Sequence, residues 1–433
     1  MVAQPIESDQ KAGASTFIGL KAYSEDQSHI FFGRVEEIRT LYKLINANTL
    51  TILFGKSGTG KTSLLNAGVF PKLRKNYCLP FRIRLEFLDD SADLLTQINQ
   101  VLKSEIDKYG FKVDAYPTTE TLWEFFHREP LWKVITPILI FDQFEEIFTL
   151  AKKSSRFKKQ ELDLLLEELS DLIENSIPEK IKDQFINNEN IGYSFDKQKA
   201  KIIFSFREDF LPEIESITAQ IPSAKNSRYR LMPMDGHQAY EVITKTWKNA
   251  IDPAEANRIV YFLTNETETE SVDIENRYGK YDLIEVEPSL LSQVCSYIDK
   301  ERLSENRDKI SADFLGKYPK GKILRSLYDQ ALLESNTIDT SENHDGEKPR
   351  NLIKEFIEDN LITDEGYRTK FALKNLDERL RPGIDTLRRK YFIREEGNLI
   401  ELTHDVIVTL VKSDREERRK QMALQVERKK ARK

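Results

Sequence analysis

One stretch constrains the fold more than any other: residues 50–66, LTILFGKSGTGKTSLLN. In it, an apolar run of β-forming residues is followed by a glycine-rich turn and then by a helical segment. The glycines permit a tight turn that directs backbone N–H groups at an anion, and the start of the following helix favours phosphate. The succession of strand, turn and helix predicts a P-loop in an α/β core with a parallel sheet and flanking helices.

The spacing within this loop predicts individual roles. Lys61 is expected to reach the β- and γ-phosphates of a nucleotide, and Thr62 to bind Mg²⁺ through its hydroxyl. The expected cofactors are therefore ATP or ADP and Mg²⁺. The loop residues predicted to contact the nucleotide are Gly55, Ser57, Gly58, Thr59, Gly60, Lys61, Thr62 and Ser63.

Length and composition narrow the class of protein. A chain of 433 residues is too long for one ordinary core and predicts about two to four units. Its 39% hydrophobic and 32% charged residues are typical of a soluble globular protein, and no apolar run approaches the length of a membrane span. The two cysteines, Cys78 and Cys295, lie far apart without metal-ligand spacing, which argues against a disulfide framework or structural zinc and favours a cytoplasmic location.

Charge is distributed unevenly along the chain. The net charge is −6, yet residues 412–433 hold ten Lys or Arg against four Asp or Glu, a local +6 that leaves −12 elsewhere. An acidic body makes nucleic acid an unlikely partner of the molecule as a whole. A solvated helical extension is the plain interpretation of the basic C-terminal helix, and docking to a membrane surface or an acidic partner is the alternative.

Strand and helix patterns alternate after the P-loop, which supports a parallel sheet. We expect a helix from an N-cap at Ser91, a helix near Trp123, and a polar surface insertion over residues 176–199. The expected further strands are 81–88, 137–141, 201–206 and 229–234.

An acidic cluster follows the buried strand at 137–141. Asp142, at the strand's carboxyl end, is where a P-loop ATPase places a Mg²⁺-binding carboxylate. Glu145 is the better candidate to orient or deprotonate the attacking water, with Glu146 as its substitute; both also suit an ordinary acidic helix start. Arg207, at the end of the strand 201–206, is expected to sense or stabilise charge on the γ-phosphate.

Two segments are candidates for the adenine side of the site. Phe32, Gly33 and Arg34 precede a helix that begins at Val35, and such residues commonly pack over an adenine; the alternative is an aromatic anchor for that helix. Pro233 is expected to form one wall of the adenine pocket, or merely to end its strand.

Beyond Asp252 the strand signals fade and helical patterns dominate, which predicts a helical lid. After a polar linker from Ser341, two helices and a hairpin that turns at Glu396-Gly397 predict a winged-helix domain. The expected division is a disordered tail at 1–16, a P-loop core at 17–250, a lid at 251–340, a winged helix at 341–411 and a basic C-terminal helix at 412–433.

Six segments together resemble successive signatures of the novel STAND NTPases, relatives of the NACHT and NB-ARC ATPases. They are FIGLKAYSEDQSHIFFGR, GKSGTGKT, ILIFDQFEEIF, IIFSFRED, LMPM and ELTHD, and they lie between Phe17 and Leu410. The resemblance implies a core, helical domain and winged helix that close over ADP and open when ATP replaces it. It also implies a slow, regulatory ATPase in prokaryotic signalling or defence, with a protein partner or self-assembly on activation.

The resemblance extends to single residues. The DQFEE string is similar to the NACHT pattern of a magnesium-binding aspartate followed three positions on by an acid, which supports Asp142 and Glu145. Arg207 resembles the sensor arginine of the family. Thr403-His404-Asp405 resembles the Met-His-Asp motif, whose histidine touches bound ADP, although threonine stands here in place of methionine.

Two other functions compete with the switch. A winged-helix, initiator-like ATPase would bind duplex DNA, but residues 351–411 mix acids and bases instead of presenting a strongly basic face. An inert scaffold would retain ADP without turnover. No repeat period or effector motif indicates what the switch controls.

Overall fold

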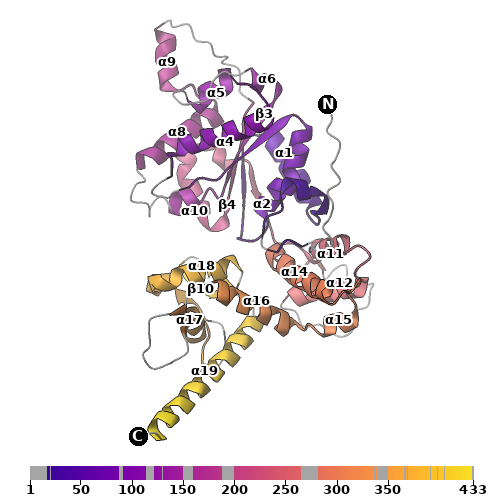
Figure 1. The fold of residues 1–433 in the computed structure, drawn as a ribbon. Coiled ribbons are helices and arrows are strands. Elements are labelled where there is room, and N and C mark those ends of the chain that lie inside the picture. The colour runs from indigo at the N-terminus through magenta and orange to yellow at the C-terminus, as the bar shows by residue number, and fades with distance from the viewer. Residues whose placement is uncertain are drawn as a thin grey trace. The chain divides into compact units, whose positions relative to one another are not determined.

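The computed structural model describes residues 17–19, 21–86, 91–113, 121–128, 130–149, 159–187, 199–264, 281–335, 338–339, 350–364, 367, 369–390, 392–396, 398–403 and 405–431 (Figure 1). The chain forms two compact units. The first is Ala22–Pro233, and the second joins the residues from Met234 onward to those that precede Ala22. The finer domain limits expected from the sequence remain predictions.

The first unit is built on a five-stranded sheet with the order β2-β3-β4-β1-β5. All four neighbouring pairs of strands are parallel, which confirms the predicted α/β core with a parallel sheet. The strands are β1 (Leu50–Gly55), β2 (Cys78–Ile83), β3 (Thr136–Asp142), β4 (Lys201–Arg207) and β5 (Arg228–Arg230).

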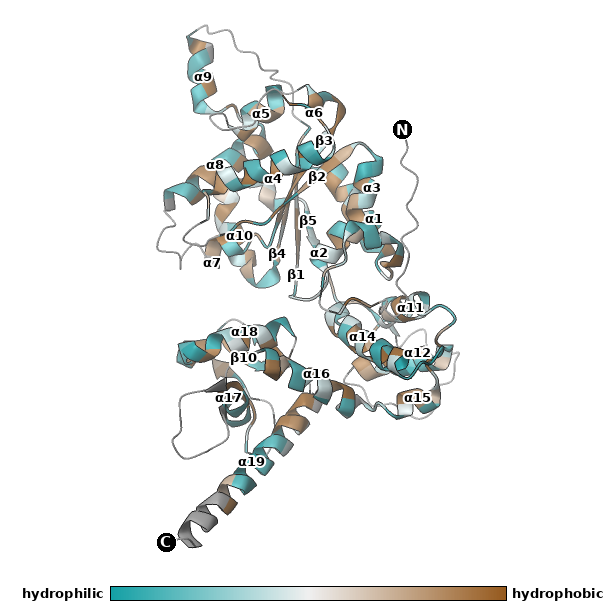
Figure 2. Ribbon diagram, viewed as in Figure 1, coloured by the Kyte–Doolittle hydropathy of each residue, from teal (hydrophilic) through white to brown (hydrophobic). Residues whose placement is uncertain are grey.

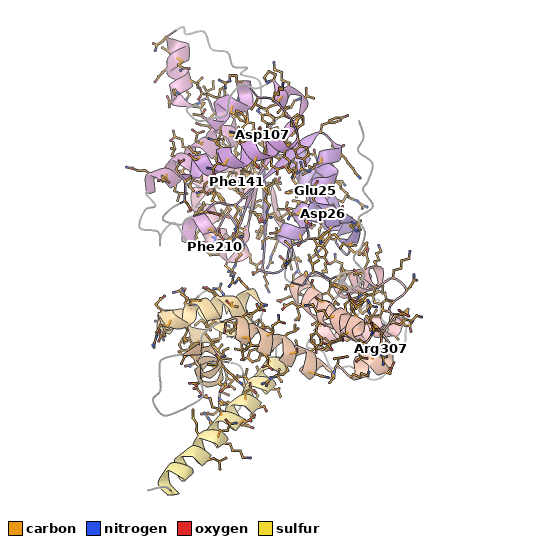
Figure 3. The ribbon with its side chains drawn as sticks, in the orientation of Figure 1. Glu25, Asp26, Asp107, Phe141, Phe210 and Arg307 are labelled. Carbon is orange, nitrogen blue, oxygen red and sulfur yellow. The ribbon has the colours of Figure 1, made fainter. Side chains whose placement is uncertain are left out.

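Both faces of this sheet are covered by helices, so the central strands are apolar on both sides (Figure 2). Alternate residues of β3 enter different hydrophobic clusters. Leu139 and Phe141 join the cluster that contains Ile98 and Leu169, and Ile138 joins the one that contains Leu41. Phe141, labelled in Figure 3, is fully buried in the former. The continuous apolar run seen in the sequence thus reflects burial on two faces.

The α-helices of the first unit are α1 (Val35–Ala47), α2 (Lys61–Ser63), α3 (Phe70–Lys75), α4 (Leu94–Lys108), α5 (Leu122–Arg128), α6 (Leu131–Val134), α7 (Glu146–Thr149), α8 (Lys159–Glu174), α9 (Glu179–Ile186) and α10 (Leu211–Ser216). A π-helical segment, η2 (Leu64–Val69), joins α2 to α3 without a break. The short 3₁₀ segments are η1 (Glu25–Ile30), η3 (Glu208–Phe210), η4 (Ile217–Ala219) and η5 (Pro222–Lys225). Helix α9 lies within the stretch that was expected to be a surface insertion.

The predicted limits of β2 and the predicted start of α4 are wrong. The strand expected at 81–88 is β2, which begins at Cys78 and ends at Ile83, because its parallel partner β3 pairs with it only from Thr136 to Phe141. The helix expected to be capped by Ser91 is α4, and its N-cap is Asp93, whose carboxylate accepts a 2.9 Å hydrogen bond from the Thr96 N–H.

The strand expected at 229–234 is also shorter than predicted. Strand β5 covers Arg228–Arg230, and the Leu231 N–H still donates to the Phe54 carbonyl at 2.7 Å. Pro233 has no N–H with which to continue the ladder. Met234 instead forms an antiparallel bridge with Val286 in the second unit.

The second unit is mostly helical and contains the predicted hairpin. Strands β9 (Ile393–Glu396) and β10 (Leu399–Leu402) pair antiparallel, and β8 (Phe371–Ala372) pairs with β10. Strands β6 (Ile338–Asp339) and β7 (Arg350–Asn351) form a separate pair. The helices are α11 (Gly236–Thr246), α12 (Pro253–Leu263), α14 (Pro288–Ser304), α15 (Ala312–Gly316), α16 (Lys320–Glu334), α17 (Leu352–Asn360), η7 (Leu373–Asn375), η8 (Glu378–Leu380), α18 (Arg381–Arg389) and α19 (Asp405–Ala431). Among the described residues, no helix combines the length and apolar character needed to cross a membrane.

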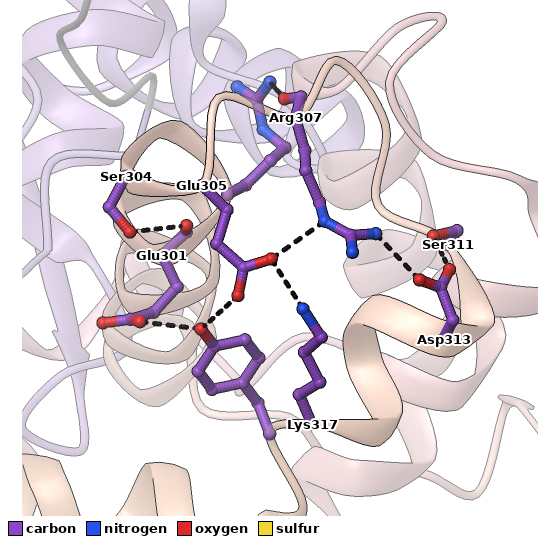
Figure 4. A network of polar contacts seen from close by, with 9 residues as sticks. Glu301, Ser304, Glu305, Arg307, Ser311, Asp313 and Lys317 are labelled. Atoms are coloured by element: carbon purple, nitrogen blue, oxygen red, sulfur yellow. Dashed lines mark hydrogen bonds and ion pairs between the residues drawn. The ribbon is translucent and has the colours of Figure 1, made fainter.

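Polar contacts connect the end of α14 to α15 (Figure 4). The Glu305 carboxylate accepts hydrogen bonds from Arg307, Lys317 and the Tyr318 hydroxyl. Arg307 also pairs with Asp313 at 2.9 Å. Because Asp313 and Lys317 are exposed and Glu305 and Arg307 are only partly buried, the ion pairs of this network fix the local geometry more than they add to stability.

Helix α19 contains the basic C-terminal residues, and its first half is anchored by buried charges. The Arg415 guanidinium is buried and donates to the Thr363 carbonyl at 2.8 Å, while the buried Asp414 carboxylate pairs with Arg325 and Lys354. From Arg419 to Leu424 every side chain is exposed. These exposed side chains are therefore available for the docking to a membrane surface or an acidic partner that the basic charge suggests.

Gly55 allows β1 to end close to the backbone that follows β5. A Cβ atom at this position would lie 2.5 Å from the Leu231 carbonyl oxygen, where neither backbone can shift cheaply. We expect Gly55→Ala to lower the free energy of unfolding of the first unit by about 1–3 kcal/mol, measured by calorimetry. Gly321→Ala is the control, because its Cβ would meet nothing within 4 Å. Equal melting of Gly55→Ala and the wild type would contradict this explanation.

Candidate nucleotide-binding site

The candidate site lies at the carboxyl ends of three neighbouring strands of the first unit. In the register of β1 and β4, Gly55 is opposite Arg207. In the register of β3 and β4, Asp142 is opposite Ser205. The parallel sheet thus brings together the P-loop, the acidic cluster and Arg207, although they are far apart in the sequence.

The P-loop backbone has the conformation that its glycines were expected to permit. Gly58 and Gly60 have φ angles of 80° and 88°, a left-handed region in which a side chain is strained. Between them, Thr59 is buried and its hydroxyl donates to the Lys56 carbonyl at 2.9 Å. Ser57 is exposed at the tip of the loop. The helix begins directly after Gly60, so its first N–H groups are close to the loop.

Lys61 is folded back on the loop that precedes it. Its Nζ donates to the carbonyl oxygens of Gly55 and Lys56 at 2.8 and 3.0 Å. Burial lowers the pKa of Lys61 to about 8, while the negative charges of Glu145 and Asp142 act in the opposite direction. A phosphate group would offer this ammonium a stronger acceptor than two neutral carbonyls.

Thr62 and Asp142 form an oxygen-rich pair. The Thr62 hydroxyl donates to Asp142 Oδ2 at 3.0 Å, and the Ser205 hydroxyl donates to Asp142 Oδ1 at 3.2 Å. The Asp142 side chain is only 3% exposed. A buried carboxylate beside a hydroxyl is the type of donor set that Mg²⁺ prefers, so these residues fit the metal that the P-loop implies.

Arg82 is a site residue that the sequence analysis did not identify. From β2 it donates to Asp142 Oδ2 with both Nε (3.1 Å) and Nη2 (2.7 Å). Two positions on, Arg84 pairs with Glu146 at 3.3 Å. The signal was present in the sequence FRIRL, because residues two apart on a strand share a face. Recognising it required knowing that β2 is the neighbour of β3.

Glu145 and Glu146 differ in their surroundings. Glu145 is buried, and burial raises its pKa against the opposing charges of Lys61 and Arg207. Glu146 is the first residue of α7; burial raises its pKa too, but Arg84 opposes this directly. Gln143, between Asp142 and these acids, has a φ of 60°, a costly conformation that turns the chain sharply after β3.

Arg207 extends from the last position of β4. It forms an ion pair with Asp209, and its guanidinium lies 5.9 Å from the centre of the Phe210 ring. Its Nε is buried, and no acceptor for it is found among the described residues. The cation is therefore held at the strand end beside the P-loop, and its sensor role remains a prediction.

The residues predicted for the adenine side have structural partners of their own. Arg34 is buried and donates to the carbonyl oxygens of Thr59 (3.2 Å) and Met232 (2.9 Å). It also pairs with Glu37 at 2.7 Å. Arg34 thus joins the P-loop to the end of the first unit. Whether it also contacts an adenine remains a prediction.

The remaining predicted contacts are placed as follows. Phe32 is half-buried, and Gly33 has a left-handed φ of 76° just before α1. Ser63 accepts a 3.1 Å hydrogen bond from the Tyr23 N–H through its hydroxyl oxygen. Pro233, half-buried, is the last residue of the first unit. His404 lies outside the described residues, so its predicted contact with ADP remains a prediction.

Comparison with known proteins assigns the chain to a family. Among solved structures, a Walker-type ATPase of Pyrococcus abyssi is 14% identical, with coverage of 91% of this chain and 99% of that one, at a TM-score of 0.44. The ORC1 protein of Aeropyrum pernix, solved in complex with DNA, is 10% identical over 90% of this chain and 94% of that one, also at 0.44. These similarities are too low to carry an argument. No curated protein matches the sequence. The family model of Novel STAND NTPase 1 matches residues 17–276, more than half of the chain, and the protein therefore belongs to this family.

Proposed function

We propose that this NTPase is a molecular switch that binds ATP with Mg²⁺, hydrolyses it slowly, and differs in conformation between its ADP and ATP states. One observation carries the proposal. Lys61, Thr62, Asp142 and Glu145, which have complementary roles in phosphoryl transfer, meet at the carboxyl ends of β1 and β3. A P-loop that served only to bind phosphate would not need a buried carboxylate beside its lysine.

In this proposal, Thr62 and Asp142 would hold Mg²⁺, which neutralises charge on the phosphates when it is bound. Glu145 orients or deprotonates the attacking water. Its raised pKa and buried position suit a proton acceptor better than those of Glu146, which is already paired with Arg84. Arg207 stabilises charge on the γ-phosphate from the neighbouring strand.

The second unit is the proposed moving part. The order of α17, β8, α18 and the β9–β10 hairpin supports the proposed winged helix, and α12 to α16 lie within residues 251–340, the range proposed for the helical lid. Closure over ADP and opening with ATP follow from the family resemblance, as does a role in prokaryotic signalling or defence with a protein partner or self-assembly. Coupling requires that the nucleotide contact the two conformations differently.

Charge pairing in the winged-helix segment favours a switch over the DNA-binding alternative. Helix α18 occupies the place of a recognition helix, but Arg381 pairs with Glu378, and Arg388 pairs with both Asp385 and Glu395. Arginines neutralised in this way release few counterions from DNA. Weak binding to duplex DNA, with little salt dependence, is the expected result of a direct assay.

The hydrolytic assignment is tested by three matched variants. We expect Glu145→Gln to slow ATP turnover by about 10²- to 10⁴-fold while ATP affinity is kept, because only the proton acceptor is lost. Asp142→Asn is expected to raise the Mg²⁺ concentration needed for ATP binding as well. Glu146→Gln is the control. If that variant alone abolished turnover, the base would be Glu146, and if wild-type protein showed no turnover at all, the chain would be an inert scaffold.

Nucleotide binding is also expected to take up a proton. In the free protein the pKa of Lys61 is lowered to about 8, and the negative phosphates raise it again. Proton uptake on ADP binding should therefore rise from about 0.1 per site at pH 7 to about 0.9 at pH 9. Calorimetry in buffers of different ionisation enthalpy measures it. The same small uptake at both pH values would contradict the position assigned to Lys61.

His404 tests the closed ADP state. If its imidazole donates to the β-phosphate only in that state, His404→Ala should speed ADP release by about ten- to a hundredfold, the value of one charge-assisted hydrogen bond. Release of a fluorescent ADP analogue measures this rate. His29→Ala, an exposed histidine of the first unit, is the control. An unchanged release rate in His404→Ala would contradict the contact with the β-phosphate and would indicate that His404 only packs within its domain.

A further inference from the structure

The carboxyl end of β2 presents two arginines to the acidic cluster. Arg82 contacts Asp142, which ends β3, and Arg84 contacts Glu146, which begins α7. Arg82 lies within β2, Arg84 directly follows its last residue, and the two differ in what they touch. Arg82 meets the carboxylate that would bind the metal, and Arg84 meets an acid that the proposed reaction does not need.

Asp142 requires a compensating cation because it is buried. Its side chain is 3% exposed, and an unpaired carboxylate at such depth is strongly unfavourable. Lys61 does not compensate by contact, since its Nζ is hydrogen-bonded to the carbonyls of Gly55 and Lys56. The guanidinium of Arg82 does, with two hydrogen bonds to one oxygen.

Of the two Asp142 oxygens, that one lies closer to Thr62, the other expected metal ligand. Asp142 Oδ2 accepts from Arg82 twice and from the Thr62 hydroxyl, the second expected metal ligand, at 3.0 Å. A cation bound by Asp142 and Thr62 would share this position with the guanidinium. Two positive charges in contact with one carboxylate oxygen repel each other, so binding of one opposes binding of the other.

The position of Arg82 also allows its ion pair with Asp142 to dissociate. Its side chain is 40% exposed, so water can solvate the guanidinium as soon as the ion pair breaks. A divalent ion bound at Asp142 would compensate the buried carboxylate in place of the guanidinium, so Arg82 can be displaced without leaving that charge unpaired.

We propose that Arg82 is an internal counter-cation that pairs with the Asp142 carboxylate and competes there with Mg²⁺. It compensates the buried charge and raises the Mg²⁺ concentration at which a nucleotide is accepted. This rests on the proposed function, because it assumes that the P-loop binds Mg²⁺ with ATP. Arg82 is thus a positioning residue with a regulatory effect on metal loading.

The test is a Mg²⁺ titration of the full chain at a fixed concentration of a fluorescent ATP analogue. Arg82→Gln should lower the Mg²⁺ concentration for half-maximal binding by about three- to thirtyfold. Without nucleotide it should melt at a lower temperature than the wild type, and saturating Mg²⁺ and ATP should reduce that difference. Arg84→Gln, the matched control two residues further along the chain, should need as much Mg²⁺ as the wild type.

Other results would overturn the proposal. An unchanged or higher Mg²⁺ requirement in Arg82→Gln would indicate that Arg82 contacts the nucleotide or supports the Mg²⁺-bound site, and does not compete with the metal. An equal shift in Arg84→Gln would indicate a general charge effect. If Arg82→Gln does not fold, Arg82→Met tests the same point, since it keeps the apolar stem and removes the charge, and a requirement no lower than that of the wild type again counts against competition. If the wild type bound no analogue at any Mg²⁺ concentration, the proposed function itself would fail.

Discussion

The arrangement of the site depends above all on one buried group, the carboxylate of Asp142. Its hydrogen-bond donors come from three elements: Thr62 from the helix after the P-loop, Ser205 from β4 and Arg82 from β2. A carboxylate taken out of water must be matched by such donors, so the three elements are held in a fixed arrangement around the end of β3. Two of these donors also bear on metal binding. Thr62 would bind the metal together with Asp142, and Arg82 would be displaced by it.

The sequence predicts the strands and the loop that carry the candidate site where the signals are local. The P-loop follows from glycines within one turn, and β3 and β4 follow from continuous apolar runs that end in Asp142 and Arg207. Parallel pairing then accounts for the meeting of these residues, because the carboxyl ends of the strands share one edge. Such features need no knowledge of which strand lies beside which.

The contacts that the sequence did not predict join residues that are far apart in the chain. Arg82 is 60 residues from Asp142 in sequence, and its role follows only from the order β2-β3-β4-β1-β5. Arg34 was expected beside an adenine, and its structural bonds to Thr59 and Met232 required the P-loop and the end of the first unit to be placed. The predicted start of α4 was wrong for a local reason. Ser91 and Asp93 are both good N-caps, and propensity alone does not choose between them.

The account makes the nucleotide the source of a conformational change, and the electrostatics of the first unit suit that role. Lys61 and Glu145 both have pKa values shifted toward their neutral forms by burial, so a bound phosphate and metal would alter the charge balance at the site. The most direct test is small-angle scattering of Glu145→Gln with Mg²⁺ and saturating ADP or ATP. The account predicts a larger radius of gyration, or a larger assembly, with ATP. Identical scattering in the two nucleotides, with binding of both verified, would contradict a switch.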